Sequence, residues 1–389
     1  MKRRYLQPLI ERDMADRMVF IGGPRQVGKT TLSRQVGGAY PGFLYLNWDS
    51  RDDRQKIIGS VFPSEMPLII FDEIHKYKGW KNYLKGLYDT RGSSTRLLAT
   101  GSARLDVYRR GGDSLFGRYR YYRLHPFSLR EAIGRAPDIA VFQPLSFLRA
   151  KNLRAVFQSL YTFGGFPKPF TKKDGVEWRR FQNERVELVI KQDIRDLEHV
   201  HDLSGLEVLV ELLPGKVGSL LSANALQEDL QVTHKTVAHW LTILERFYYH
   251  FRIYPFASTK IKSLRKQPKM YLWDWSATPD GPARLENIVG SDLLKLVHYL
   301  YDAFGYKAEL YYLRDVEGRE VDFLVAIDKK PWFAVEVKTG DQAVASSLPY
   351  FAKRLKIPFM YQIVSDTGVD VMNGAIRIMS VEKFLSGLV

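Results

Sequence analysis

Residues 23–30 read Gly23-Pro-Arg-Gln-Val-Gly28-Lys29-Thr30 and match the pattern G-x-x-x-x-G-K-[ST]. A short apolar run, Val19–Ile21, precedes them, and a helical pattern begins at Lys29. Glycines let the backbone turn with its N–H groups pointing inward, and together with a helix N-terminus these groups form a cradle for phosphate. The stretch predicts a phosphate-binding loop between a strand and a helix. The alternative is a glycine-rich turn that only caps the helix.

The residues of this loop have individual expected roles in nucleotide binding. Lys29 supplies a positive charge to the β- and γ-phosphates of a nucleotide, and Thr30 supplies a hydroxyl to Mg²⁺. We therefore expect ATP and Mg²⁺ as ligands. The residues expected to hold the nucleotide are Gly23, Pro24, Arg25, Gln26, Val27, Gly28, Lys29, Thr30 and Thr31.

Polar residues follow two of the next apolar runs. Leu68–Phe71 is continuously apolar and ends in Asp72 and Glu73. In a chain with a phosphate-binding loop, Asp72 is expected to hold Mg²⁺ through water and Glu73 to polarise the attacking water. Ser102 follows the run Leu97–Thr100 and is a candidate for orienting that water, although a plain turn explains it nearly as well.

Phosphoryl transfer also uses a cation at the γ-phosphate, which a neighbouring subunit often contributes. Arg118, in Leu115-Phe-Gly-Arg118, is the first candidate for this role. The competing interpretation is an arginine on a solvated basic surface.

The order of apolar runs predicts an α/β fold. Five strand candidates alternate with helical patterns, which is typical of a parallel sheet. The chain becomes helical from about residue 140 to 250 and returns to mixed strands and helices after 283. We therefore expect three domains, a P-loop ATPase domain at 1–135, a helical and winged-helix domain at 136–278 and a mixed α/β domain at 279–389. The five strand candidates are Val19–Ile21, Phe43–Trp48, Leu68–Phe71, Leu97–Thr100 and Arg120–Leu124.

Composition narrows the functional classes. The 389 residues include 58 Lys+Arg and 43 Asp+Glu, a net charge of +15, and 45% are hydrophobic, which excludes wholesale disorder. The absence of cysteine excludes disulfides, thiolate zinc sites and a cysteine nucleophile. No apolar run approaches the roughly 20 residues of a membrane span, so we expect a cytoplasmic protein without a membrane partner. The positive charge points to a polyanionic partner, most simply nucleic acid such as DNA, and a protein that merely happens to be basic explains the net charge equally well.

Residues 226–246 suggest a helix-turn-helix. Val237, Trp240, Leu241 and Leu244 recur at helical spacing and predict a buried face, which leaves the opposite face to read DNA. Residues 251–273 hold six Lys/Arg and no acid, as a phosphate-gripping wing would. A helical lid that never touches DNA is the alternative. The predicted DNA-binding residues are Lys235, His239, Lys260, Lys262, Arg265 and Lys266.

The carboxyl-terminal part carries a second constellation. Asp322, Glu336 and Lys338 form Asp-(x)13-Glu-Val-Lys on two apolar strands, and alternation puts Glu336 and Lys338 on one face. Asp322 and Glu336 can hold Mg²⁺, Lys338 can activate water, and Glu286 can complete the site. Each residue alone is more often an ordinary strand charge.

These motifs together resemble the archaeal-type AAA+ (P-loop) ATPases that carry a winged-helix domain and a carboxyl-terminal nuclease-like module of the PD-(D/E)xK kind (DUF4143-type). The resemblance covers nearly the whole chain. It implies a nuclease-type mixed sheet at the carboxyl-terminal end and an ATPase that works as a ring. The residues that carry it are Gly23–Thr30, Phe71–Glu73, Thr100–Ser102, Gly117 and Arg118, His125–Glu131, Tyr161–Pro167, Lys269–Asp274, Glu286, Asp322, Glu336 and Lys338.

Three functions follow as hypotheses. The first is an ATP-driven motor or switch that binds DNA as a homo-oligomer, with a hexamer favoured and branched or forked DNA as a candidate substrate that the sequence does not specify. The second is an ATP-gated, Mg²⁺-dependent DNA endonuclease. The third is a nucleotide switch that binds a protein partner in signalling or defence.

Overall fold

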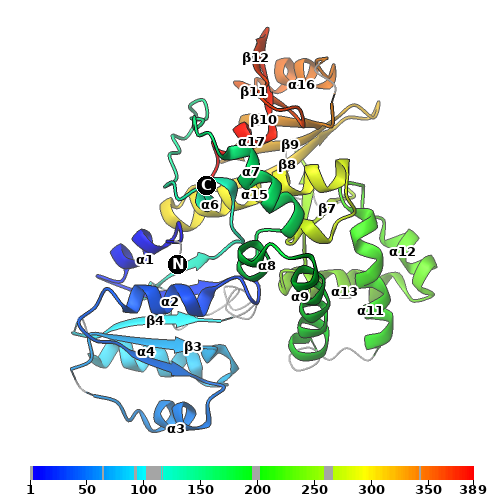
Figure 1. Cartoon of the computed structure of the whole chain (residues 1–389). Coiled ribbons are helices and arrows are strands. Elements are labelled where there is room, and N and C mark those ends of the chain that lie inside the picture. Colours follow the sequence, from blue (N-terminus) through cyan, green and yellow to red (C-terminus); the bar gives the residue numbers. More distant parts are fainter. Residues whose placement is uncertain are drawn as a thin grey trace. The chain divides into compact units, whose positions relative to one another are not determined.

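The computed structural model describes residues 3–63, 65–91, 94–101, 115, 117–194, 202–257, 266–340 and 343–389, without the side chains of 191–193. The chain forms two compact units, Met1–His125 and Pro126–Val389 (Figure 1). Among the described residues, no helix is both long and apolar enough to cross a bilayer.

The first unit contains a five-stranded sheet in the order β2-β3-β4-β1-β5, and every pairing in it is parallel. This confirms the predicted α/β class and all five predicted strands. The buried strands β1 and β3 are apolar at almost every position, as expected for strands covered on both faces. The strands are β1 (Met18–Gly22), β2 (Leu44–Asn47), β3 (Leu68–Asp72), β4 (Arg96–Thr100) and β5 (Tyr119–Arg123). The helices are α1 (Gln7–Asp13), α2 (Lys29–Gly37), α3 (Arg51–Gly59) and α4 (Trp80–Arg91).

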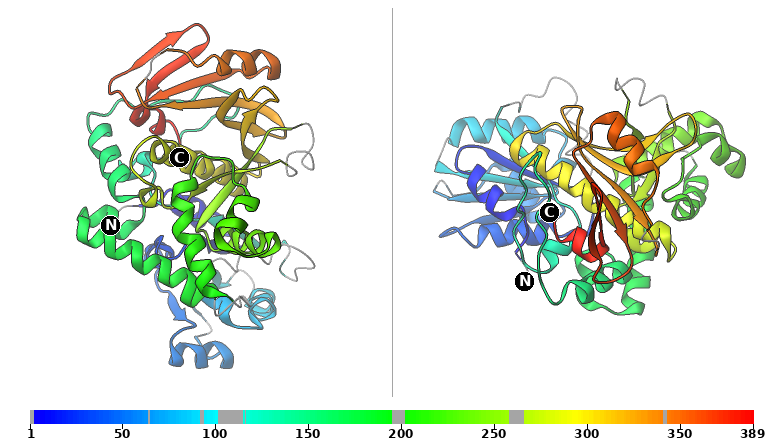
Figure 2. Two further views of the ribbon diagram at one scale, coloured as in Figure 1. Left: turned by 90° about the vertical axis from the view of Figure 1, so that its right-hand side faces the viewer. Right: turned by 90° about the horizontal axis from the view of Figure 1, so that it is seen from above.

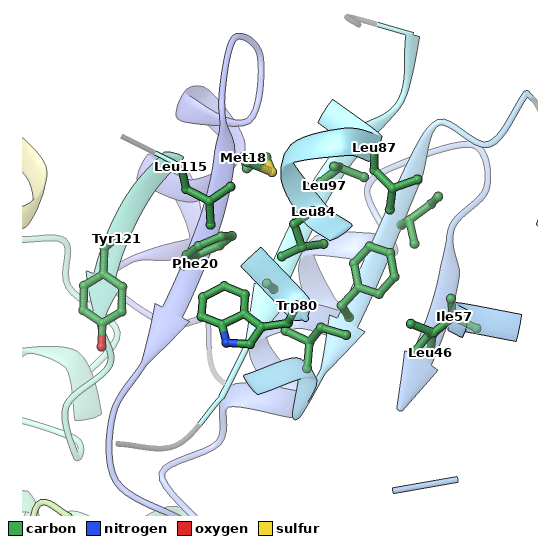
Figure 3. Close-up of a cluster of buried hydrophobic side chains, with 14 residues drawn as sticks. Met18, Phe20, Leu46, Ile57, Trp80, Leu84, Leu87, Leu97, Leu115 and Tyr121 are labelled. Carbon is green, nitrogen blue, oxygen red and sulfur yellow. The ribbon is translucent and has the colours of Figure 1, made fainter. Parts of the chain in front are cut away.

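An apolar core fixes α4 against this sheet (Figure 3). Trp80, Leu84 and Leu87 recur at i, i+4 and i+7, so they lie on one helix face, and all three are buried. The Trp80 ring meets Phe20 of β1 edge-on, with 5.7 Å between ring centroids. The core thus holds the strand that leads into the predicted phosphate-binding loop.

The second unit contains an eight-stranded mixed sheet in the order β12-β13-β11-β10-β9-β8-β6-β7. Its strands are β6 (His250–Pro255), β7 (Lys269–Leu272), β8 (Ala308–Arg314), β9 (Glu320–Ile327), β10 (Lys330–Lys338), β11 (Phe359–Val364), β12 (Asp370–Asn373) and β13 (Ile376–Ser380). Its helices are α6 (Leu129–Ala132), α7 (Leu153–Phe163), α8 (Pro167–Lys172), α9 (Gly175–Glu187), α11 (Leu203–Leu212), α12 (Ala223–Leu230), α13 (His234–Arg246), α15 (Pro282–Phe304), α16 (Ser347–Leu355) and α17 (Val381–Leu385).

Two helices cover opposite faces of this sheet (Figure 2). The long helix α15 approaches β9 closely at Gly290, where an added Cβ would lie 3.0 Å from the Phe323 ring. Helix α16 packs on the other face, in a core that includes Leu324 and Ala334. Phe323 and Leu324 are successive residues of one strand, so their side chains point to opposite faces.

The hairpin of β6 and β7 belongs to the same sheet as the carboxyl-terminal strands. Tyr254 and Pro255 of β6 pair with Tyr311 and Tyr312 of β8 in a parallel register. The predicted boundary between residues 278 and 279 therefore falls inside one compact unit, because the hairpin continues the sheet across it.

Candidate functional site

The loop after β1 has the backbone that its glycines predict. Gly23 and Gly28 have φ of 140° and 99°, in the region where side chains are disfavoured. At Gly23 an added Cβ would lie 2.4 Å from the Leu124 carbonyl oxygen, so the close approach of the loop to this neighbour requires glycine. Lys29 is buried, and its Nζ donates to the carbonyl oxygens of Gly23 (3.0 Å) and Pro24 (2.8 Å). The loop thus wraps around a buried ammonium at the start of α2.

Asp72 lies beside this loop because the sheet is parallel. The carboxyl ends of β1, β3 and β4 meet at one edge, with Ile21 opposite Thr100 and Phe71 opposite Ala99. Asp72 is 3% exposed and accepts a hydrogen bond from the Thr30 hydroxyl at 2.7 Å. The structure thus brings together the hydroxyl and the carboxylate that were assigned to Mg²⁺ from the sequence.

Two further hydroxyls bind Asp72, and sequence reasoning assigned neither. Tyr45 donates to Oδ2 at 2.5 Å and Thr100 donates to Oδ1. For Thr100 the available signal was its position, because β4 ends at the same sheet edge as Asp72, whereas Tyr45 lies inside β2, opposite Ile70. Oxygen donors are what Mg²⁺ prefers, so Thr30 and Asp72 fit this ion.

Glu73 follows Asp72 in a left-handed conformation, with φ of 54°. Its Oε2 is buried and has no hydrogen-bond partner among the described residues, with Lys76 Nζ at 3.8 Å and His75 Nε2 at 3.7 Å. Burial raises the pKa of Glu73 above the usual 4.5, while Lys29 and Lys76 oppose the rise. A desolvated carboxylate with a raised pKa is suited to accept a proton from water.

Arg118 lies at the other end of the sheet. It immediately precedes β5, and its carbonyl oxygen accepts from the N–H of Met18 at the start of β1. One five-residue strand, about 16 Å, separates that edge from the phosphate-binding loop. Its guanidinium donates to Asp89 of α4 at 2.8 and 3.2 Å. Within its own unit Arg118 is thus far from the loop, while Ser102 lies outside the described residues.

A second cluster forms in the carboxyl-terminal sheet. Glu286 of α15 and Asp322 of β9 both contact the ammonium of Lys269, at 3.2 and 3.1 Å, and Glu320 lies 2.6 Å from it. Tyr271 also donates to Glu286, at 2.6 Å. The structure thus unites Glu286 with Asp322, but around a lysine that the sequence analysis had placed in a basic wing.

Glu336 and Lys338 complete the cluster. Lys338 Nζ lies 2.8 Å from Glu336 Oε1, which confirms that the two side chains share a face. Burial and the neighbouring Asp322 raise the pKa of Glu336 to about 7, and burial and Asp322 also raise that of Glu286 to about 7. Among the residues that the structure describes, no group of three or more His, Asp or Glu is placed to hold a metal ion.

The two helices α12 and α13 are joined by the short turn Gln231–Thr233. Thr233 caps α13 by accepting from the Thr236 N–H at 3.1 Å. The predicted inner face, which includes Trp240, is buried, whereas Lys235 and His239 are exposed.

A pocket beside the N-termini of α12 and α13 is lined by residues that include His234, Arg252 and Lys266. Lys266 is exposed, and Arg252 is held by Glu245 at 2.5 Å. The remaining predicted DNA-binding residues, Lys260, Lys262 and Arg265, lie outside the described residues.

Three family models match successive segments of the chain. Residues 15–133 match an AAA domain, residues 154–277 match a domain of unknown function (DUF8612), and residues 283–383 match another domain of unknown function (DUF4143). With its parallel sheet and phosphate-binding loop, the amino-terminal unit is a P-loop, AAA-like ATPase domain.

Similar proteins include an uncharacterized protein of Mycobacterium tuberculosis, 23% identical over 340 residues, which cover 85% of this chain and 72% of that protein. An uncharacterized protein of Methanocaldococcus jannaschii is 25% identical over 67% of this chain and 61% of its own length. Among solved structures, a Walker-type ATPase of Pyrococcus abyssi is 12% identical, with a TM-score of 0.42 over 70% of this chain and 93% of that one. The ORC1 protein of Aeropyrum pernix in complex with DNA is 12% identical, with a TM-score of 0.33 over 75% and 91%.

Proposed function

We propose that this protein hydrolyses ATP, binds DNA and works as a ring-shaped homo-oligomer, with a hexamer favoured. The observation that carries the ATPase proposal is the hydrogen bond between Thr30 and Asp72. It joins the first turn of α2 to the end of β3, so that the loop, the Mg²⁺ ligands and Glu73 share one sheet edge.

Each side chain at this edge has a defined task. The N–H groups of the loop and Lys29 bind the β- and γ-phosphates, while Thr30 and Asp72 hold Mg²⁺. Bound Mg²⁺ neutralises charge on the phosphate oxygens. Glu73 orients the attacking water and accepts its proton, because its Oε2 has no competing hydrogen bond among the described residues.

The DNA-binding proposal is supported by exposed basic residues around the short turn before α13. Lys235, His239 and Lys266 are exposed, and the net charge of the chain is +15. Lysines that contact phosphates release counterions from the DNA, so the affinity for DNA is expected to fall steeply with salt.

The ring-shaped oligomer also gives Arg118 a role. This side chain lies far from the phosphate-binding loop of its own unit, so in this proposal it supplies the cation at the γ-phosphate of a neighbouring subunit.

The test combines ATPase rates with DNA binding, on single-stranded, duplex, forked and four-way DNA. Lys29→Ala is expected to abolish hydrolysis, whereas Lys78→Ala, an exposed lysine of the same unit, leaves the rate unchanged. Hydrolysis at the wild-type rate in Lys29→Ala would contradict the assigned site.

DNA contact is tested separately by fluorescence anisotropy at several salt concentrations. Lys235→Ala/Lys266→Ala is expected to weaken binding and to lower the salt slope by about 2, because each lysine that no longer neutralises a phosphate lowers it by roughly 1. The matched control, Lys172→Ala/Lys353→Ala, removes two exposed lysines elsewhere in the same unit. Equal effects of the two variants would reject this surface. DNA-indifferent hydrolysis with tightly held ADP would favour a nucleotide switch for a protein partner.

A further inference from the structure

The Lys269 side chain lies at the centre of the carboxyl-terminal carboxylate cluster. Lys269 is 3% exposed and sits on β7, where it pairs with Ile253 of β6. An ammonium has three N–H donors, and its nitrogen lies 2.6–3.2 Å from three carboxylates. Each N–H group of the Lys269 ammonium can therefore donate to one carboxylate, those of Glu286, Glu320 and Asp322.

Without this ammonium the cluster would be electrostatically unstable. Four carboxylates gather here, and buried charges of one sign are tolerated only when cations or protons compensate them. Lys269 compensates three of them, Lys338 binds Glu336, and Arg314 binds Glu320 at 2.7 Å. The protein's own cations therefore compensate the negative charge that a bound metal ion compensates in other carboxylate sites.

The oxygens that would ligate a metal are mostly engaged. Asp322 Oδ1 faces Lys269, and its Oδ2 accepts from the N–H of Val337 at 2.9 Å. Glu336 Oε1 is taken by Lys338. Glu336 Oε2 remains, buried and without a hydrogen-bond partner among the described residues, in a side chain that is 7% exposed. Glu286 accepts from both Lys269 and Tyr271 through Oε1, which leaves its Oε2 as a second oxygen with no hydrogen bond among the described residues. Two unengaged oxygens, with the Lys269 ammonium bound to Glu286 and Asp322, do not make a site for a divalent ion, which takes several oxygen ligands.

We propose that Lys269 is the resident cation of this cluster and takes the place of a divalent metal, so that a metal site formed by Glu286, Asp322 and Glu336 opens only when Lys269 is removed. The nuclease-like constellation expected from the sequence then does not fit Mg²⁺ in this chain. This inference is independent of the ATPase proposal, since it concerns other residues in the other unit.

The experiment measures Mn²⁺ binding to the full-length chain without nucleotide, by the loss of the free-ion signal in electron paramagnetic resonance. The wild type and Asp322→Asn are expected to bind Mn²⁺ equally, because the wild-type cluster holds none. Lys269→Met keeps most of the side-chain volume without the charge, and it is expected to gain about one Mn²⁺ per chain. That gain should disappear in Lys269→Met/Asp322→Asn, and Lys269→Arg should not show it.

Thermal unfolding provides a second readout. Mn²⁺ is expected to raise the melting temperature of Lys269→Met by more than that of the wild type, because a ligand that binds only the folded state stabilises it. Mn²⁺ binding by the wild type that Asp322→Asn abolishes would overturn the proposal, and this comparison stands even if Lys269→Met does not fold. A folded Lys269→Met that gains no Mn²⁺ would overturn it as well, as would plasmid cleavage by the wild type that depends on Asp322.

Discussion

Glu73 has two features that set it apart from an ordinary strand-end acid. Its φ of 54° is uncommon for a residue other than glycine, asparagine or aspartate, and its Oε2 is buried without a hydrogen-bond partner among the described residues. Unsatisfied buried groups and left-handed backbones cost free energy, so they persist where the surrounding fold imposes them. At Glu73 both features lie beside the loop that is proposed to bind phosphate.

The residue-scale prediction concerns Glu73→Gln. Removal of a general base is expected to slow ATP hydrolysis by about 10²- to 10⁴-fold. ATP binding should remain, because Lys29 and the loop are intact. The control is Glu65→Gln, at an exposed position of the same unit. Equal ATPase rates for Glu73→Gln and the wild type would exclude Glu73 as the base.

The pH profile of the wild type provides an additional readout. Glu73 acts when ionised, so hydrolysis falls as the pH drops through its pKa. Burial places that pKa above the usual 4.5, and the acid limb therefore lies at a higher pH than that of an exposed carboxylate. The residual hydrolysis of Glu73→Gln should lack this limb.

At the scale of elements, a buried ion pair ties α6 to α15. The Lys295 ammonium is 1% exposed and lies 2.7 Å from Glu131 and 3.0 Å from the Ser128 hydroxyl. Asp292, one turn earlier on α15, is also buried, and burial raises its pKa to about 7. The helical spacing of α15 was visible in the sequence, but its charged partner on α6 lies more than 160 residues away.

The element-scale prediction is the loss of this pair. Lys295→Met leaves Glu131 buried without its cation, and removal of one partner from a buried pair typically costs about 3–5 kcal/mol of unfolding free energy. Lys295→Met/Glu131→Gln should recover part of that loss, since Glu131 then no longer contributes a buried charge without its cation, whereas Asp292 remains. Urea denaturation followed by tryptophan fluorescence measures both effects. Lys353→Met, on an exposed face of α16, should change stability by less than about 0.5 kcal/mol. If Lys295→Met also changed the free energy of unfolding by less than about 0.5 kcal/mol, the buried pair would not stabilise the fold.

At the scale of the whole molecule, the eight-stranded sheet joins the helical middle of the chain to its carboxyl-terminal part. β6 pairs with β8 across the long helix α15, which lies between them in the sequence. Lys269 of β7 also contributes the central cation to acids on α15 and β9. Strands that precede residue 279 therefore complete both the sheet edge and the ion-pair cluster of the carboxyl-terminal part.

The whole-molecule prediction compares two fragments. Residues 126–389 expressed alone should fold and unfold cooperatively, because they contain a complete compact unit. Residues 279–389 alone lack β6 and β7, so β8 becomes an open edge and the carboxylates lose Lys269. We expect this shorter fragment to aggregate or to remain partly unfolded in circular dichroism and size-exclusion chromatography. A stable, monomeric 279–389 would show that the hairpin is dispensable.

Local sequence patterns predicted much of this architecture. The strands β1 to β5 and the buried face of α13 follow from the periodicity of apolar residues over short segments. Asp72 could be placed near Thr30 because strands of a parallel sheet end at the same edge. No local sequence pattern predicted the ion pair between Arg118 and Asp89. It joins the residue before β5 to the face of α4, about one strand length away from the phosphate-binding loop.

The phosphate-binding loop, the five strands of the first unit and the acids at the end of β3 could be read from the residues alone, because each is encoded by residue types within one short segment. The contacts of the basic and acidic residues of the second unit depend instead on how distant segments pack together. Lys269 looked like one more phosphate-binding lysine, yet it is buried among acids that lie 17 to 53 residues further along the chain. The physical reason is that the partner of a charge is set by which strands and helices become neighbours, and composition does not encode that choice.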